Sequence, residues 1–73
     1  MQRNPRKDPI PGDVVEFRTT PKSETWGRFR VQRIGDDGTV FYWDEGFIDY
    51  VPLKRWREWF VGRRGIRVTP NVL

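Results

Sequence analysis

Arginine and aromatic side chains have the greatest capacity for binding chemistry in this chain. Its 73 residues include 14 Lys and Arg against 10 Asp and Glu, a net charge of +4, with four Trp, two Tyr and five Phe. Guanidinium groups bind phosphates, and aromatic rings stack on bases or hold cations. With no His and no Cys, the usual general base, thiol nucleophile and structural zinc ligands are missing. We therefore expect a binding protein that uses no cofactor or metal and is not an enzyme.

The charged residues are segregated along the sequence. Residues 36–49 hold five acidic side chains and no basic one, whereas residues 53–67 hold six basic side chains and one Glu. A basic stripe formed by the second segment and by arginines within residues 28–33 would suit a phosphate backbone. The predicted nucleic-acid-binding residues are Arg28, Arg30, Arg33, Lys54, Arg55, Arg57, Arg63, Arg64 and Arg67. The alternative is an ordinary solvated surface rich in arginine.

The aromatic residues form a second candidate site. In residues 40–43 a strand would place Val40 and Tyr42 on one face and Phe41 and Trp43 on the other. One of these faces needs a further cover, and most aromatic rings in proteins belong to the core. If the cover is incomplete, we expect an exposed aromatic patch drawn from Trp26, Tyr42, Trp43, Phe47 and Tyr50.

Such a patch would favour a protein or peptide as the partner. In this alternative, the rings of Trp26, Tyr42 and Trp43 hold a cationic side chain together with Asp44 or Asp49. A third alternative is a homodimer that closes over apolar surface left uncovered.

Residue types and spacing predict a mainly β domain with one helix. Val, Ile, Phe, Trp and Tyr supply most of the apolar side chains and Ala is absent, a composition typical of strands. Leu53, Trp56 and Phe60 instead recur at helical spacing, which predicts a short helix over residues 52–61. Gly-containing turns are expected at residues 35–38 and 44–46. The predicted strands cover residues 14–19, 26–34, 39–43, 47–51 and 64–69.

Residues 1–11 differ in composition from the remainder. They combine three prolines with polar residues, so we expect a flexible, extended N-terminal tail, followed by a single domain over residues 12–73. The sequence has no apolar stretch of the kind found in secretory signals or membrane spans. A cytoplasmic location without membrane association is the expectation that follows.

The turn and core residues resemble the Tudor-like and Agenet-like SH3 barrels. The resemblance lies in the segments Gly12–Val15, Trp26–Val31, Gly38–Asp44 and Gly46–Leu53. It implies a five-stranded barrel with a short helix between the fourth and fifth strands, and in many members an aromatic cage for methylated Lys or Arg. Residues 51–59 also resemble short bacterial and phage proteins of presumed SH3-like fold. An open five-stranded sheet with the helix on one face is the alternative architecture.

Taken together, these features favour a small, non-enzymatic module that associates with DNA or RNA. Arginines would position the phosphate backbone, and one or two aromatic rings would add stacking with little sequence specificity. The rival hypothesis remains a protein or peptide adaptor.

Overall fold

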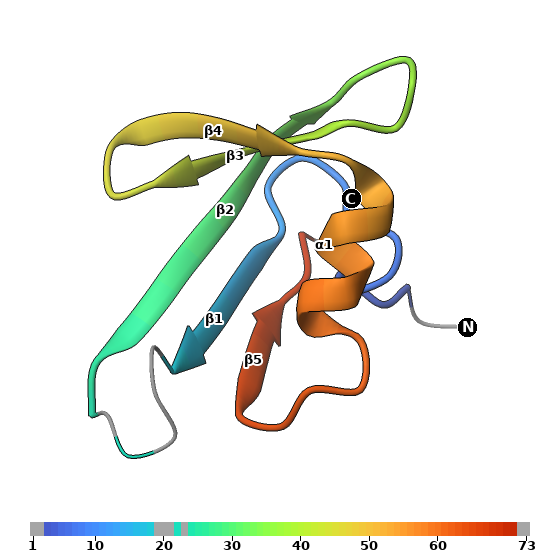
Figure 1. Ribbon diagram of the computed structural model, residues 1–73. Helices are drawn as coiled ribbons and strands as arrows, with labels where there is room; N and C mark the ends of the chain where they lie inside the picture. The colour runs from blue at the N-terminus through green and yellow to red at the C-terminus, as the bar shows by residue number, and fades with distance from the viewer. Residues whose placement is uncertain (1–2, 19–21, 23, 72–73) are drawn as a thin grey trace.

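The fold is mainly β, with five antiparallel strands in one sheet and a single short helix (Figure 1). It was obtained as a computed structural model that describes residues 3–18, 22 and 24–71. The predicted order of elements is confirmed within these residues. The elements are β1 (Val14–Arg18), β2 (Trp26–Ile34), β3 (Val40–Asp44), β4 (Phe47–Val51), α1 (Leu53–Phe60) and β5 (Ile66–Thr69).

The strands lie in the order β4-β3-β2-β1-β5. The long strand β2 pairs with β1 along its first half and with β3 along its second half, and the register with β3 shifts between Val31 and Arg33. Irregularities of this kind bend a strand and increase its twist. In Figure 1 the β3–β4 pair accordingly runs at a steep angle to β1 and β5, and the long strand β2 connects the two parts of the sheet. The sheet is not closed, because β4 and β5 are its two edges.

The turn between β3 and β4 is tighter than the three-residue loop that the sequence indicates. Asp44 and Phe47 are directly paired, so the loop consists of Glu45 and Gly46 alone. Both residues have positive φ, at 50° and 90°. This is the conformation of the two-residue turns that match the natural twist of a hairpin. The turn also fixes which residues of β4 bond to β3.

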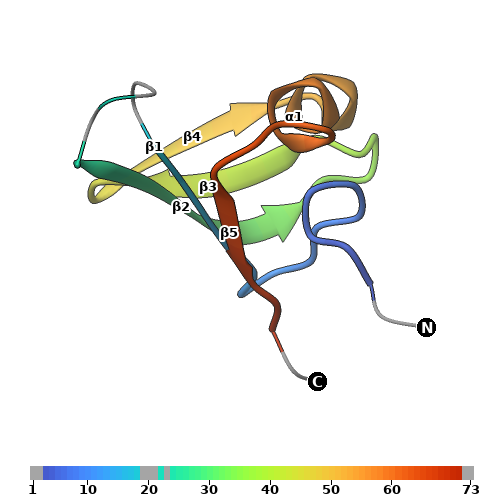
Figure 2. The same ribbon diagram turned by 90° about the horizontal axis from the view of Figure 1, so that it is seen from below.

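Helix α1 covers the inner face of the sheet (Figure 2). It begins after Pro52 and ends before Gly62, whose φ is 77°. Its residues Trp56 and Phe60 are fully buried, with ring centroids 4.8 Å apart. They pack on a core that the strands supply: Val15, Val31, Val40, Tyr42, Val51 and Ile66. Among the described residues, no helix has the length and apolar character needed to cross a membrane.

Residues 3–11 do not extend away from the domain as the sequence suggests. Asn4 accepts a hydrogen bond from the amide of Lys7, which begins a turn, and Pro5 is fully buried. The indole N–H of the buried Trp56 donates to the carbonyl oxygen of Pro5 at 3.0 Å. A buried indole N–H needs an acceptor, and here the N-terminal segment supplies it.

The same segment is fastened by a buried carboxylate at the start of β1. Asp13 is fully buried and pairs with both terminal nitrogens of Arg3, at 2.8 Å between Nη2 and Oδ1. It also accepts hydrogen bonds from the backbone amides of Ile10 at 2.8 Å and Asn71 at 2.7 Å. Burial raises the pKa of this carboxyl, but the bonds from Arg3, Asn71 and Ile10 outweigh it and hold the pKa below its usual value.

Removing the charge of Asp13 should therefore destabilise the fold. Asp13→Asn is expected to lower the free energy of unfolding by about 3 kcal/mol, because the guanidinium of Arg3 loses its partner. The exposed Asp8 pairs with Arg57 at 3.1 Å, so Asp8→Asn is the matched control and should cost less than about 1 kcal/mol. Urea unfolding of the three proteins measures both effects. Equal, small losses would contradict a structural role for the Asp13 carboxylate.

The stability of the native protein should also depend on acid pH. The folded state holds the pKa of Asp13 below that of the unfolded chain, so the stabilisation is present above about pH 4 and is lost as pH falls further. Asp13→Asn should lack this part of the pH dependence.

Candidate functional site

The outer face of the sheet, on the side away from α1, gathers arginine and aromatic side chains. Strand register defines it, because residues directly opposite each other share a face. Trp43 of β3 lies opposite Arg30 of β2, and Arg18 of β1 lies opposite Trp26 of β2. The outward residues of β1 to β3 and β5 include Glu16, Arg18, Trp26, Arg28, Arg30, Arg33, Phe41, Trp43 and Arg67.

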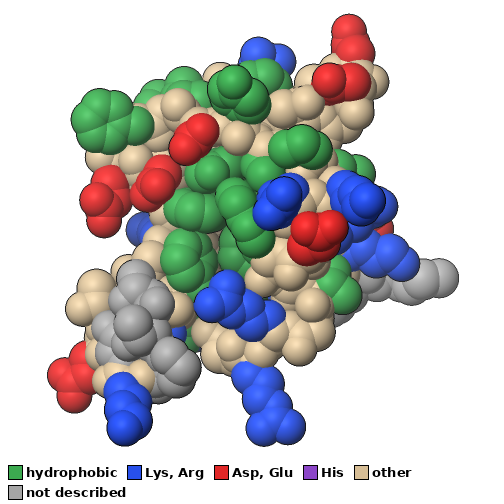
Figure 3. Space-filling view, viewed as in Figure 1, with side chains coloured by type: hydrophobic (Ala, Val, Ile, Leu, Met, Phe, Trp, Pro, Cys, Tyr) green, Lys and Arg blue, Asp and Glu red, His purple; other side chains and the backbone are tan. Residues whose placement is uncertain are grey.

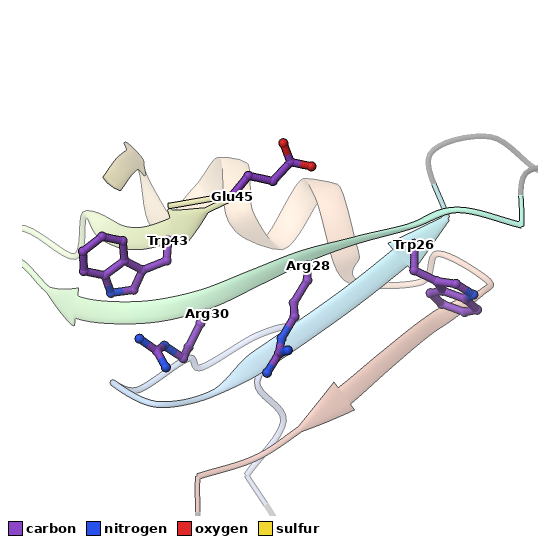
Figure 4. A pocket seen from close by; sticks show the side chains of 5 residues that line it. All are labelled: Trp26, Arg28, Arg30, Trp43 and Glu45. Carbon is purple, nitrogen blue, oxygen red and sulfur yellow. The ribbon is translucent and has the colours of Figure 1, made fainter. Parts of the chain in front are cut away.

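An open pocket of about 360 Å³ lies on this face (Figure 4). Trp26, Arg28 and Arg30 project from alternate positions of β2, and Trp43 and Glu45 contribute from β3 and the turn after it. Trp26 and Trp43 stand at opposite ends with the two arginines between them. Alternate residues of one strand lie about 7 Å apart, so Trp26, Arg28 and Arg30 are spaced regularly along β2, and Trp43 stands beside Arg30 on the neighbouring strand.

Trp26 is already stacked with cations, whereas Trp43 is not. The guanidinium carbon of Arg67 lies 3.7 Å from the centroid of the Trp26 ring, and that of Arg18 lies 5.2 Å away. Arg67 is also 3.9 Å from Glu16, a pair that solvent screens. Among the described residues, no ring or guanidinium stacks on Trp43. Trp43, which is half-buried and has Ile48 of β4 as its cross-strand neighbour, is therefore the indole on this face with no described cation stacked on it.

The predicted basic residues fall into two groups on different sides of the molecule. Arg28, Arg30, Arg33 and Arg67 lie on the outer face, where Arg33 stacks on Phe41 at 3.7 Å. The second group comes from α1 and the loop after it, on the side of the sheet that α1 covers: Lys54, Arg55, Arg57, Arg63 and Arg64. The single stripe that the sequence suggests is therefore divided by the sheet.

Two members of the second group already have partners. Arg57 donates through Nε to the carbonyl oxygen of Lys7 at 2.8 Å and pairs with Asp8. Arg55 pairs with Glu58 at 3.6 Å, although both side chains are largely exposed. Arg57 therefore serves to hold the N-terminal segment against α1, which makes the helix side a weaker phosphate site than the outer face.

The predicted aromatic patch is likewise divided. Tyr42 is buried in the core, and its ring lies 4.3 Å from that of Phe29, measured between centroids. Trp43, the next residue in β3, points to the outer face, so these two rings cannot surround one cation. Phe47 and Tyr50 are highly exposed on β4 but point to opposite faces of that strand.

The inner face retains a small apolar depression of about 190 Å³ beside α1. Phe17, Phe29, Trp59, Phe60 and Arg63 line it. Figure 3 shows the hydrophobic band here, with acidic side chains gathered near the β3–β4 turn and Lys and Arg over and below α1. Arg63 is the one charged side chain among the described residues that line the depression, so the depression offers fewer contacts to a phosphate backbone than the outer face.

Arg18 and Glu45 are among the outer-face residues that were absent from the predicted site. Arg18 is placed beside Trp26 by the pairing of β1 with β2, and the alternation of Glu16 and Arg18 was the signal available. Glu45 reaches the pocket because the turn is only two residues long. Within the ranges the structure describes, no group of three or more acidic side chains is arranged to hold a metal ion.

Comparisons with family models, with curated proteins and with solved structures found no match. The geometry and chemistry of the outer face are therefore the basis from which a function can be inferred.

The buried position of Tyr42 gives a prediction at alkaline pH. Burial, followed by the charges of Asp49 and Asp44, raises the pKa of Tyr42 to about 12. The folded pKa exceeds that of the unfolded chain, so this contribution to stability is complete below about pH 10 and lost as pH rises through about 12. The tyrosinate absorbance of the native protein should show this late step, and Tyr42→Phe should remove it. Retention of the late step in Tyr42→Phe would contradict the assignment.

Proposed function

We propose that this chain is a non-enzymatic module that binds single-stranded DNA or RNA through the outer face of its sheet, with low sequence specificity. The observation that carries the proposal is the row formed by Trp26, Arg28, Arg30 and Trp43, which together line an open pocket on one face of the sheet. Arginines and uncovered rings on one surface are the combination that single strands require.

Arginines would supply most of the affinity. Arg28 and Arg30 project from the middle of β2, and Arg18, Arg33 and Arg67 extend the positive charge to either side. Guanidinium groups bind phosphate oxygens in a bidentate manner, and each phosphate neutralised releases counterions. Such contacts fix the path of the backbone but do not read sequence.

Trp43 would supply stacking, because its ring faces are free of other described rings and guanidiniums. Trp26 would contribute mainly by orienting Arg18 and Arg67, which stack on it. Glu45 also lines the pocket, although its carboxylate points away from the arginines in Figure 4; its charge would repel phosphates and confine the strand to the line of the arginines. Stacking on ring faces accepts every base, which agrees with low specificity.

The architecture supports an SH3-like module as part of the same proposal. Five antiparallel strands with a long bent β2 and a helix between β4 and β5 suit the Tudor-like resemblance of the sequence. The Tudor-like cage is not part of the proposal, because Tyr42 lies in the core and Trp43 on the other face.

Binding should be measured with fluorescently labelled single-stranded DNA, single-stranded RNA and duplex DNA at two salt concentrations. We expect micromolar affinity for the single strands at low salt, weaker binding to the duplex, and a steep loss with salt. Arg28→Ala combined with Arg30→Ala should reduce the slope of log affinity against log salt by about 1.4 for single strands, about 0.7 for each phosphate contact. No binding to any of the three probes at low salt would remove the proposal.

A matched double variant tests whether position or net charge matters. Arg55→Ala combined with Arg64→Ala removes the same two charges from the helix side and should leave the slope nearly unchanged. Trp43→Leu should weaken binding by about 1–3 kcal/mol with little change in slope. Glu45→Gln should tighten binding. Equal losses in the two double variants would indicate attraction by net charge alone and contradict a specific face.

A further inference from the structure

Strand β4 is an edge strand with an unusual share of exposed apolar surface. Phe47 is 77 % exposed, Tyr50 67 % and Ile48 49 %, and among the described residues only Val61 is a further large hydrophobic side chain with such exposure. Edge strands are normally protected by lysine, proline, bulges or a covering segment. β4 has no Lys or Pro, and no described strand pairs with its free edge.

The other edge of the sheet is protected. Arg6 of the N-terminal segment donates through Nη2 to the carbonyl oxygen of Ile66 in β5, at 3.0 Å. A long side chain therefore occupies a backbone acceptor on β5 that an added strand would need. Of the two edges, β4 is the one that presents its backbone for pairing.

The turn geometry identifies the free backbone groups of β4. In a hairpin with a two-residue turn, the flanking pair Asp44 and Phe47 is hydrogen-bonded, and so is every second pair beyond it. The amides and carbonyls of Ile48 and Tyr50 consequently point away from β3. The amide of Tyr50 is bonded to the Oδ1 atom of Asp49 at 2.8 Å, which confirms its outward direction. An incoming strand would take over this donor and release the carboxylate.

The negative charge of the β3–β4 hairpin determines which kind of incoming strand can pair with β4. Asp44, Glu45 and Asp49 belong to the β3–β4 hairpin, and residues 36–49 contain no basic side chain. A second copy of β4 would bring an equally acidic hairpin against this one, and like charges on adjacent strands are destabilising. A strand with Lys or Arg at alternate positions would instead pair with Asp49, while its apolar positions would pack on the exposed side chains.

We propose that the free edge of β4 binds an extended, basic peptide segment, which adds to the sheet as a sixth, antiparallel or parallel strand. Main-chain hydrogen bonds to Ile48 and Tyr50 supply affinity, and the acidic hairpin supplies selectivity for basic partners. The edge groups of β4 point away from Arg28 and Arg30 on β2, although Ile48 adjoins Trp43 across the β3–β4 pair, so a module bound to nucleic acid could hold a protein partner at the same time.

The test uses the full chain and a ten-residue peptide of alternating Lys and Val with blocked ends. Amide NMR should show shifts concentrated at Ile48 and Tyr50, and the amide of Ile48 should become protected from hydrogen exchange. The same peptide with alternate backbone nitrogens methylated, and a peptide of alternating Glu and Val, should each bind at least tenfold more weakly. Equal binding of the methylated peptide would overturn the proposal, because it would show attraction by charge without strand addition.

Substitutions in β4 complete the test. Ile48→Pro removes an outward N–H without touching the bonds to β3, and should weaken binding at least tenfold. Ile48→Thr keeps that N–H and is the matched control, with a smaller loss. Asp49→Asn should reduce the preference for the Lys peptide over the Glu peptide. Unaltered binding by Ile48→Pro, shifts centred on Trp26 and Arg28 of β2, or sedimentation showing a dimer through β4 would each contradict the proposal.

Discussion

The fold depends on one eight-residue helix, α1, which covers the inner face of the five-stranded sheet. Trp56 and Phe60 fill the centre of that face and bury the core residues of every strand, which a sheet this small could not bury by itself. Because α1 is short, it cannot also reach the end of the β3–β4 hairpin. Phe47 is left exposed there. Because α1 packs on the inner face alone, it leaves the outer face to charged and aromatic side chains.

The N-terminal segment compensates for this limited core. It supplies the acceptor for the indole of Trp56, places Arg3 on the buried carboxylate of Asp13, and holds Arg57 of the helix. Asp13 in turn bonds to the backbone of Asn71, just after β5. Both ends of the described chain therefore converge on one buried carboxylate at the start of β1. Because the sequence has no Cys, the ion pair and hydrogen bonds of Asp13 join the two ends in place of a disulfide.

Local patterns predicted the elements well, and long-range contacts account for what they missed. The spacing of Leu53, Trp56 and Phe60 identified the helix to within one residue at either end, and the bounds of β2 and β4 matched. The role of Arg3 was missed, because its partner Asp13 is ten residues away and no local period connects them. Gly27 illustrates the same limit: a Cβ there would lie 2.5 Å from the ring of Phe17 across the sheet, a contact that only the register reveals.

The candidate site was predicted in composition but not in arrangement. Period-two alternation correctly placed Arg28 and Arg30 together, yet it could not tell which face of β3 the helix would cover. That choice decided that Tyr42 is a core residue and that Trp43 is a surface residue. The same choice determines which function the geometry favours. A cage needs rings that converge on one point, whereas rings and arginines spread along β2 and β3 suit an extended nucleic-acid strand. The division of the arginines has the same origin: the sheet separates those on β2 and β5 from those on α1, and phosphates following one path can meet only one of the two groups.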